Sequence, residues 1–254
     1  MWPISDKSTI GGFKIVNFDL TDAHSIIKAV EILKPDYFIN LAAQTFVGSS
    51  WDFPIQTWNC NTTGVIHILE AIRQHRPSCK FYNAGSSEEY GDVAFSPQNE
   101  THPLRPRSPY GASKAAARLI VKVYRDSYKL FAIQGLLFNH EGPRRGEEFV
   151  TRKITKGVAR IVEAIKNNKT FEPIELGNIN SRRDWSDAED FIEGIWLMLN
   201  QDKPNEYVLS SDSTHTIAEF VSEAFKAAGI QGSWHGEAEL AEYSITTKDA
   251  IKYE

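Results

Sequence analysis

Cysteine is scarce in this sequence, whose 254 residues include only Cys60 and Cys79. The first lies in a predicted helix and the second just before a predicted strand. Disulfide-stabilised domains contain many more cysteines, and metal sites need clustered ligands. We therefore expect both residues to be reduced core thiols, and we expect no metal site.

Long apolar runs and an excess of basic charge are also missing. No apolar stretch approaches the ~20 residues of a membrane-spanning helix, and Met1-Trp2-Pro3 does not begin a signal peptide pattern. The formal net charge is −5 with Lys and Arg scattered along the chain, whereas binding to nucleic acid or to a membrane surface needs a basic face. We expect a cytoplasmic protein with small-molecule partners, and no nucleic-acid or membrane partner.

Strand-like and helix-like segments alternate in the first half of the chain. Short apolar runs predict strands at 14–18, 37–41, 80–84 and 131–138. Helical periodicity predicts helices at about 21–34, 54–75 and 110–128. Thr21 is the expected cap of the first helix, and the continuous run 37–41 is typical of a central strand buried on both faces. This order predicts an α/β protein with a doubly wound, Rossmann-like parallel sheet.

The pattern changes beyond Asn139. A charged loop at 140–148 leads into a helix at about 150–166 and then into a shorter mix of elements up to Ala228. We interpret residues 139–254 as a smaller, interleaved C-terminal lobe that binds substrate. No element is predicted within 229–254.

The glycines do not form the turn that opens most dinucleotide-binding sheets. The 16 glycines include no G-x-G-x-x-G and no G-x-x-G-x-x-G, and Gly11-Gly12 precede a predicted strand instead of following one. The first βα unit of such a sheet is therefore missing from the sequence. If that unit exists, we expect it upstream of Met1, together with the residue that would select NAD or NADP.

Four reactive side chains lie in two short segments. Ser86 and Glu88 follow the predicted strand 80–84, at the strand end where open α/β sheets bind ligands. Tyr110 and Lys114 are four residues apart in a predicted helix, so they share a face and the ammonium can stabilise an ionised phenol. Such a phenol is a general base for a substrate hydroxyl.

Each of these signals is weak by itself. About one chain in two of this composition contains a Tyr-x-x-x-Lys spacing by chance, and Glu88 could equally be a solvated turn residue. Both segments follow the predicted strand 80–84. Their combination is a much more specific signal of this chemistry than either segment by itself.

These segments resemble the extended short-chain dehydrogenase/reductase family and, within it, the GDP-mannose 4,6-dehydratases. The resemblance covers nearly the whole chain. It rests mainly on 86–91 (SSEEYG), 107–114 (RSPYGASK), 137–146 (LFNHEGPRRG), 149–154 (FVTRKI) and 183–185 (RDW). It implies conversion of GDP-mannose to GDP-4-keto-6-deoxymannose with NADP as the cofactor. Residues 1–138 would be a partial NAD(P)-binding Rossmann domain that carries the catalytic residues, and 139–254 mainly a nucleotide-sugar-binding lobe.

The resemblance implies four catalytic roles. Tyr110 would remove the proton of the sugar 4-hydroxyl, with Lys114 as its modulator and a ribose ligand. Ser86 would be the hydroxyl partner, where the family often has Thr. Oxidation at C4 acidifies the C5–H, so Glu88 could take that proton while the 6-hydroxyl leaves as water.

The resemblance also implies binding residues. Expected cofactor contacts are Asp19, Leu20, Leu41, Ala42, Ala43, Gln44, Thr45, Tyr110, Lys114, His140 and Arg145. Expected nucleotide-sugar contacts are Asn139, Lys153 and Arg183. The cationic side chains of Lys153 and Arg183 suit a diphosphate. Simpler explanations stay open for three groups: 41–45 as a plain strand-to-loop junction, Lys153 as a solvated helix residue, and the pairs Arg144-Arg145 and Arg182-Arg183 as surface charge.

The sequence departs from the family pattern at several points. Glu89 stands where the family usually has an apolar residue, and we expect a neutral surface position. Gln56 replaces a cofactor-contacting Tyr. The chain stops before the family's C-terminal Arg-Pro-x-Glu segment, and an interface loop that contains Arg would lie upstream.

We therefore expect a chain that lacks both ends and has weak or absent activity. For the complete protein we expect a homodimer or tetramer, with helices 54–75 and 110–128 in the dimer contact.

Two other functions stay open. A related nucleotide-sugar epimerase or reductase needs Tyr and a hydroxyl but no base for C5, so Glu88→Gln separates these hypotheses. A non-catalytic binding module without the pyrophosphate loop would have no affinity for NADP.

Overall fold

The computed structural model describes residue 16 and residues 18–236 and 241–246. The chain forms two compact units. The first comprises residues 1–89, 106–134 and 203–205, and the second comprises 90–105, 135–202 and 206–254. The strand expected at 14–18 lies largely outside the described residues, and neither Val16 nor Phe18 is in a strand.

The main sheet confirms the predicted α/β class. Its strands are β1 (Tyr37–Asn40), β2 (Lys80–Ala84), β3 (Ala132–Leu137) and β6 (Glu206–Leu209), in the order β1-β2-β3-β6. β1 and β2 are parallel, with Tyr37 opposite Lys80. Strand β3 runs from the first unit into the second, where Phe138 N donates to Leu209 O at 2.9 Å.

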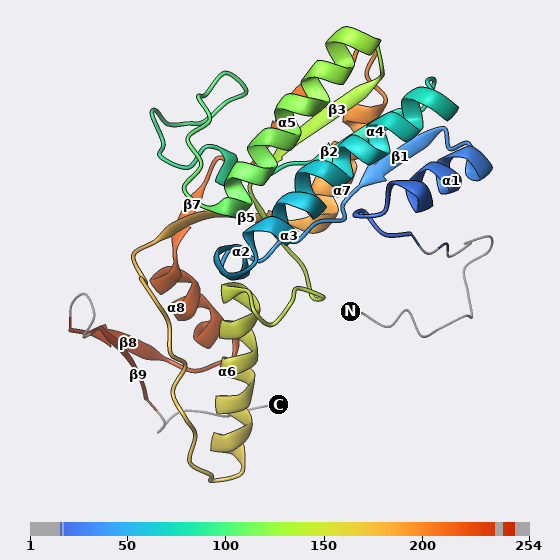
Figure 1. The fold of residues 1–254 in the computed structure, drawn as a ribbon. Coiled ribbons are helices and arrows are strands. Elements are labelled where there is room, and N and C mark those ends of the chain that lie inside the picture. The colour runs from blue at the N-terminus through green and yellow to red at the C-terminus, as the bar shows by residue number, and fades with distance from the viewer. Residues whose placement is uncertain (1–15, 17, 237–240, 247–254) are drawn as a thin grey trace. The chain divides into compact units, whose positions relative to one another are not determined.

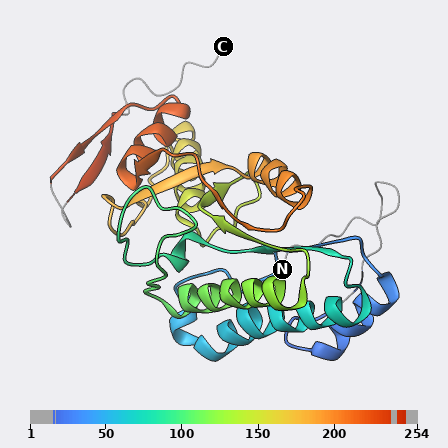
Figure 2. The same cartoon turned by 90° about the horizontal axis from the view of Figure 1, so that it is seen from above.

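Three helices lie side by side along the strands of the first unit (Figures 1 and 2). They are α1 (Ala23–Leu33), α4 (Gly64–His75) and α5 (Pro109–Tyr128). Their apolar stripes form one buried cluster with β2, which includes Ile26, Ile68, Leu69, Phe81 and Val121. The N-cap of α1 is Asp22, whose carboxylate accepts from His24 N; the expectation of Thr21 was wrong by one residue.

The helix expected at 54–75 is interrupted. After α2 (Ser49–Asp52), it begins with α3 (Pro54–Trp58), passes through a π-helical turn η1 (Asn59–Thr63) and continues as α4. A π turn inserts one extra residue and changes which side chains face the core. Here it buries the polar side chains of Asn61 and Thr62.

β1 is not buried on both faces, contrary to the prediction. It is the first strand in the order of the described sheet, and Tyr37 and Ile39 are 39% and 44% exposed. β2, between β1 and β3, is the buried central strand, with Phe81 and Tyr82 fully buried.

A row of buried amides crosses the first three strands. Asn40 Nδ2 donates to Asn83 Oδ1 at 2.9 Å, and Asn83 Nδ2 donates to Gln134 Oε1 at 2.9 Å. A shift of one strand by a single residue would leave these amides unpaired in the core, which is costly. The row therefore fixes the register of β1, β2 and β3.

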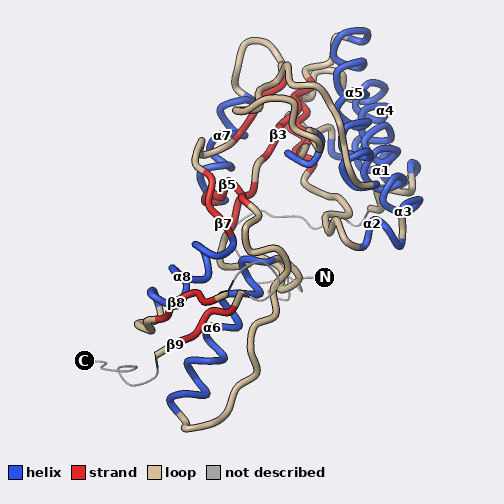
Figure 3. Tube along the Cα trace, turned by 90° about the vertical axis from the view of Figure 1, so that its left-hand side faces the viewer, coloured by secondary structure: helices blue, strands red, loops and turns tan. Residues whose placement is uncertain are grey.

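The second unit has its own sheet, β4 (Asn139–Glu141), β5 (Arg182–Asp187) and β7 (Thr214–Thr216), in the order β4-β5-β7. Its helices are α6 (Val150–Lys166), α7 (Ala188–Leu199) and α8 (Ile217–Ala227). A hairpin follows, made of β8 (Gly232–His235) and β9 (Glu242–Ile245), near α8 in Figure 3. Among the described residues, no helix is both long enough and apolar enough to span a membrane.

Candidate active site

Helix α5 packs directly onto the turn that follows β2. The Ser108 side chain caps the helix by accepting from Gly111 N at 3.0 Å, and Pro109 occupies the first turn. A Cβ on Gly111 would lie 2.6 Å from the carbonyl oxygen of Glu88. Only glycine permits this approach, so Gly111 brings the start of α5 against the Ser86–Glu88 turn.

The turn carries two of the predicted catalytic residues. It forms a short 3₁₀ helix, η2 (Ser87–Glu89), in which Glu89 N donates to Ser86 O at 3.1 Å. Glu88 N donates to Ser86 Oγ at 3.2 Å, and both side chains are half-buried. The hydroxyl and the carboxylate are thus held on one turn at the end of β2.

Tyr110 and Lys114 lie on the buried side of α5, 7% and 6% exposed. Lys114 Nζ donates to Ala84 O at 2.9 Å and lies 6.0 Å from the centroid of the Tyr110 ring. The structure therefore brings the predicted pair together beside the end of β2. Burial lowers the pKa of the Lys114 ammonium to about 8, while the charge of Glu89 opposes that shift.

Asn61 connects α5 to the loop after β1. Its Oδ1 accepts from Gln44 N at 2.8 Å, and its Nδ2 donates to Gln44 O and Ser113 Oγ, both at 3.0 Å. Ser113 Oγ in turn donates to Tyr110 O at 2.7 Å. Sequence analysis missed Asn61, because it lies inside a predicted helix and only the π turn directs it inward.

The predicted cofactor residues of the first unit lie in two segments. Leu41, Ala42 and Thr45 are exposed, while Ala43 and Gln44 are half-buried. Asp19 is exposed and accepts from Thr21 N and Oγ1, both at 2.8 Å, and these bonds lower the pKa of its carboxyl. Leu20 is buried, and its carbonyl is 2.9 Å from His67 Nδ1 of α4.

Glu89 is not the surface residue that we expected. It is fully buried, and its Oε1 accepts from Ser86 N at 2.8 Å. A carboxylate in the core needs hydrogen bonds and counter-charge. Ser86 N supplies a hydrogen bond, and Lys114 on α5 supplies an interacting positive charge. The residues around Glu89 in the sequence do not indicate this burial, because Lys114 follows Glu89 by 25 residues.

The remaining predicted ligands lie in the second unit. Asn139 and His140 are half-buried on β4, and the His140 ring stacks on Phe191 at a centroid distance of 4.7 Å. Arg145 Nε lies 3.1 Å from Glu141 Oε2, and its guanidinium covers the Phe149 ring at 3.6 Å. Lys153 on α6 and Arg183 on β5 are exposed.

Neither cysteine has a disulfide partner within the described part of the chain, and no group of three potential metal ligands occurs there. Burial raises the pKa of the Cys79 thiol to about 12 and also raises that of Cys60. Both residues are therefore protonated thiols near neutral pH.

The comparisons with known proteins agree with this geometry. The family model for GDP-mannose 4,6 dehydratase matches residues 4–254. The chain belongs to the GDP-mannose 4,6-dehydratase family. It is 44% identical over 238 residues to GDP-mannose 4,6 dehydratase 1 of Arabidopsis thaliana, covering 92% of this chain and 64% of that protein. It is 42% identical over 231 residues to the human GDP-mannose 4,6 dehydratase, covering 90% of this chain and 61% of that protein.

This member of the dehydratase family thus spans less than two thirds of the length of those relatives. Among solved structures it resembles RMD from Pseudomonas aeruginosa complexed with NADPH, with a TM-score of 0.73 and 27% identity over 81% of this chain and 69% of that one. It also resembles the Thermus thermophilus UDP-glucose 4-epimerase complex with NAD, with a TM-score of 0.68 and 28% identity over 84% of this chain and 68% of that one.

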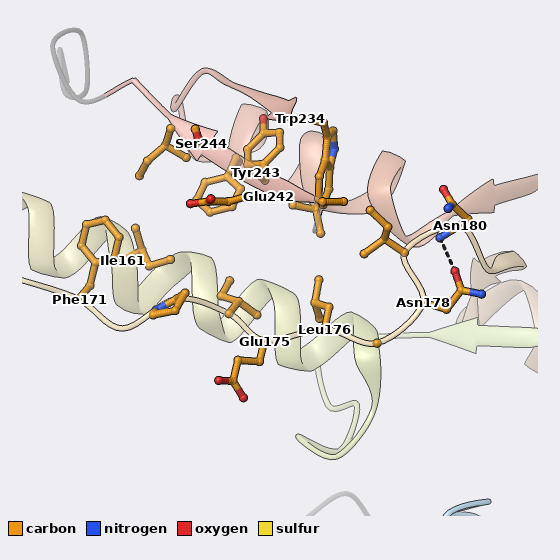
Figure 4. A pocket seen from close by; sticks show the side chains of 18 residues that line it. Ile161, Phe171, Glu175, Leu176, Asn178, Asn180, Trp234, Glu242, Tyr243 and Ser244 are labelled. Atoms are coloured by element: carbon orange, nitrogen blue, oxygen red, sulfur yellow. Dashed lines mark hydrogen bonds between the residues drawn. The ribbon is translucent and has the colours of Figure 1, made fainter. Parts of the chain in front are cut away.

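The second unit of this dehydratase-family chain also contains a cavity of about 1160 Å³ (Figure 4). α6, α8, the segment 171–180 and the β8–β9 hairpin supply its walls, which are mainly apolar and aromatic. Trp234 and Tyr243 contact each other there at a centroid distance of 5.2 Å. None of the predicted site residues lines this cavity.

Proposed function

We propose that this chain carries the catalytic residues of a GDP-mannose 4,6-dehydratase, and that it acts on GDP-mannose with NADP as the cofactor. One observation carries the proposal: Tyr110 and Lys114 are buried on one face of α5, and Gly111 of the same helix contacts the Glu88 backbone. Membership of the dehydratase family supports the choice of substrate.

Each side chain of this group has a chemical task. Tyr110 Oη takes the proton of the sugar 4-hydroxyl, and the Lys114 ammonium stabilises the resulting phenolate. Ser86 Oγ hydrogen-bonds the oxygen at C4. Glu88 then takes the proton from C5, which the new C4 ketone has acidified, and the 6-hydroxyl leaves as water, whose extra proton is balanced by the one that Tyr110 removed. The hydride removed from C4 would then be returned to C6, and Glu88 returns a proton to C5.

The residues of the first unit fit the nicotinamide-ribose part of NADP. Lys114 has three N–H donors and uses one on Ala84 O, so it can also donate to ribose hydroxyls. The small side chains of Ala42 and Ala43 would let the cofactor approach the main chain. When bound, the nicotinamide supplies a temporary hydride acceptor, so that the reaction has no net redox change. The glycine-rich turn that usually holds the pyrophosphate is not in the sequence.

NMR of the sugar product in D₂O tests the proposal. The chain is incubated at high concentration and for a long time with GDP-mannose and NADP⁺, because we expect its activity to be weak. The product should be GDP-4-keto-6-deoxymannose with deuterium at C5, because the proton at Glu88 exchanges with solvent. Glu88→Gln should abolish loss of water while oxidation at C4 persists. The control Glu31→Gln changes an exposed carboxylate of α1 and should leave product formation unchanged.

Two outcomes would overturn the proposal. Formation of a C4 epimer without loss of water would indicate a nucleotide-sugar epimerase. No conversion, together with no heat of NADP⁺ binding in calorimetry and a cooperative unfolding transition, would indicate a non-catalytic binding module.

A further inference from the structure

Glu89 is a fully buried carboxylate that the reaction scheme above does not use. It ends the η2 turn, next to Glu88, and its Oε1 accepts from Ser86 N at 2.8 Å. This hydrogen bond joins the end of the turn that carries Ser86 and Glu88 back to its first residue. The adjacent helix α5 buries two cations, Lys114 and Arg118, which are four residues apart on one face.

We propose that Glu89 is a positioning residue of this site: its hydrogen bond to Ser86 N holds the Ser86–Glu88 turn, and its buried carboxylate is the counter-charge of Lys114 on the adjacent helix. One side chain would thus act on both the Tyr110–Lys114 pair and the Ser86–Glu88 turn. This inference rests on the proposed function for its consequence in catalysis, but its electrostatic content can be measured without any substrate.

The charges around the site support this role. Burial lowers the pKa of Lys114 to about 8, and the charge of Glu89 is the main influence that raises it. On β2, burial raises the pKa of the Tyr82 hydroxyl well above its usual range, and the charge of Glu89 raises it further.

The geometry links this charge to the reacting groups. Lys114 Nζ also donates to Ala84 O at the end of β2, two residues before Ser86. Without the negative charge, burial would make a larger fraction of Lys114 neutral near pH 7, and a neutral amine stabilises a phenolate poorly. Without the hydrogen bond, Ser86 N would lose its buried acceptor and the turn would be free to shift.

The first experiment measures the pKa of Lys114 by NMR of ¹³C-labelled lysine side chains, with Lys114→Arg to assign the signal. Glu89→Gln keeps the size of the side chain and an oxygen for Ser86 N, but it removes the charge. We expect the pKa of Lys114 to fall by about one unit or more. Glu88→Gln, in the same turn, is the matched control for this titration and should leave the Lys114 pKa unchanged.

A second variant separates the two parts of the role. Glu89→Leu removes the charge and the hydrogen bond, so it should lower the Lys114 pKa as Glu89→Gln does. It should also increase amide hydrogen exchange at Ser86, which Glu89→Gln should leave protected. An unchanged Lys114 pKa in folded Glu89→Gln would overturn the proposal, whether or not the chain converts GDP-mannose.

The unsubstituted chain provides a measurement that does not depend on folding of a variant. With ¹³C-labelled glutamate, the Glu89 carboxyl signal should have the chemical shift of an ionised carboxylate at neutral pH, and it should show a small further shift as Lys114 loses its proton. A Glu89 carboxyl that is protonated at neutral pH would overturn the proposal. If the electrostatic results hold but no dehydration occurs, only the proposed function fails.

Discussion

The predicted site residues of the two units are held in different ways. In the first unit, Tyr110 and Lys114 are buried, and Lys114 donates to the carbonyl of Ala84. In the second unit, Lys153 and Arg183 are exposed on α6 and β5. The Tyr110–Lys114 pair assigned to proton transfer is therefore fixed by the core, whereas Lys153 and Arg183, two of the cations assigned to ligand binding, lie at the surface.

This difference corresponds to two physical requirements. A proton transfer needs donor and acceptor within hydrogen-bond reach, so displacement by even an ångström reduces the rate. A phosphate-binding cation acts over a longer range and can be ordered by the ligand itself, at an entropic cost of about 1 kcal/mol per side chain. Substitutions in the two units should therefore affect different measurable quantities.

The largest effect is expected for Tyr110→Phe. The change removes only the hydroxyl from a ring that stays buried, so the free energy of unfolding should change little. The rate of GDP-mannose conversion should fall by about 10²–10⁴-fold, as for the loss of a general base. Tyr128→Phe, at the exposed end of the same helix, is the matched control and should retain the parental rate. A rate within tenfold of the parent for Tyr110→Phe would remove Tyr110 from the mechanism.

The next effect tests the rigid framework of the first unit. Asn83→Ala deletes the middle of the amide row and leaves Asn40 and Gln134 without their partner at this position. Two unsatisfied buried amides should lower the free energy of unfolding by about 3 kcal/mol, measured by urea denaturation. The exposed Asn59→Ala should change it by less than about 0.5 kcal/mol. Equal stabilities for the two variants would contradict a framework that depends on this row.

For Arg183→Ala in the second unit we expect the opposite pattern, a change in substrate binding without a change in stability. Loss of one phosphate-binding cation should raise KM for GDP-mannose about tenfold, while the free energy of unfolding stays within about 0.5 kcal/mol of the parent. Its neighbour Arg182 donates to Thr214 Oγ1 at 3.0 Å and to Thr214 O at 2.6 Å, which ties β5 to β7. Arg182→Ala should therefore lower stability and leave KM unchanged. Reversed results for the two arginines would reassign the binding role to Arg182.

Sequence patterns predicted the parts of the molecule that local rules determine. The bounds of β2 and α6 agree with the apolar run at 80–84 and the amphipathic pattern at 150–166. α5 begins one residue before the predicted start, because Ser108 and Pro109 form a standard capped first turn. The same local reasoning singled out Ser86, Glu88, Tyr110 and Lys114, because two of them follow β2 and two share one face of α5; their catalytic roles stay a prediction.

The misses depend on contacts between distant segments. The hairpin β8–β9 has few apolar residues, and it is stabilised by long-range packing: Tyr243 stacks on Phe225 of α8 at a centroid distance of 5.2 Å. Glu89 has the composition of a surface turn but is buried beside a cation of a later helix. Asn61 is directed inward by a π turn, which the sequence of residues 59–63 does not predict. In each case the partner lies far along the chain, where composition and periodicity give no information.

The smallest effect concerns a polar cluster near the surface of the first unit. Arg73 binds Glu70 through Nε at 3.0 Å and Nη2 at 2.8 Å, and the Tyr124 hydroxyl donates to Glu70 at 2.7 Å. The hydrogen bonds from Arg73 lower the pKa of Glu70 from 4.5 to about 2. The folded state therefore binds this proton less tightly than the unfolded state. The resulting stabilisation is complete above pH 4.5 and is lost as the pH falls toward 2.

Glu70→Gln should lower the free energy of unfolding at pH 7 by about 1 kcal/mol, because solvent screens a side chain that is 27% exposed. Urea denaturation between pH 7 and pH 3 should show the two stabilities converging, because below pH 4.5 the unfolded parent is protonated at Glu70 while the folded parent stays ionised. Glu31→Gln, at an exposed position of α1, should change the free energy of unfolding only slightly and by an amount that does not vary with pH. A loss for Glu70→Gln as large as that for Asn83→Ala would mean that surface polar contacts stabilise the first unit as much as its buried amide row does. The distinction between a rigid interior and a surface that the ligand orders would then not hold even within the first unit.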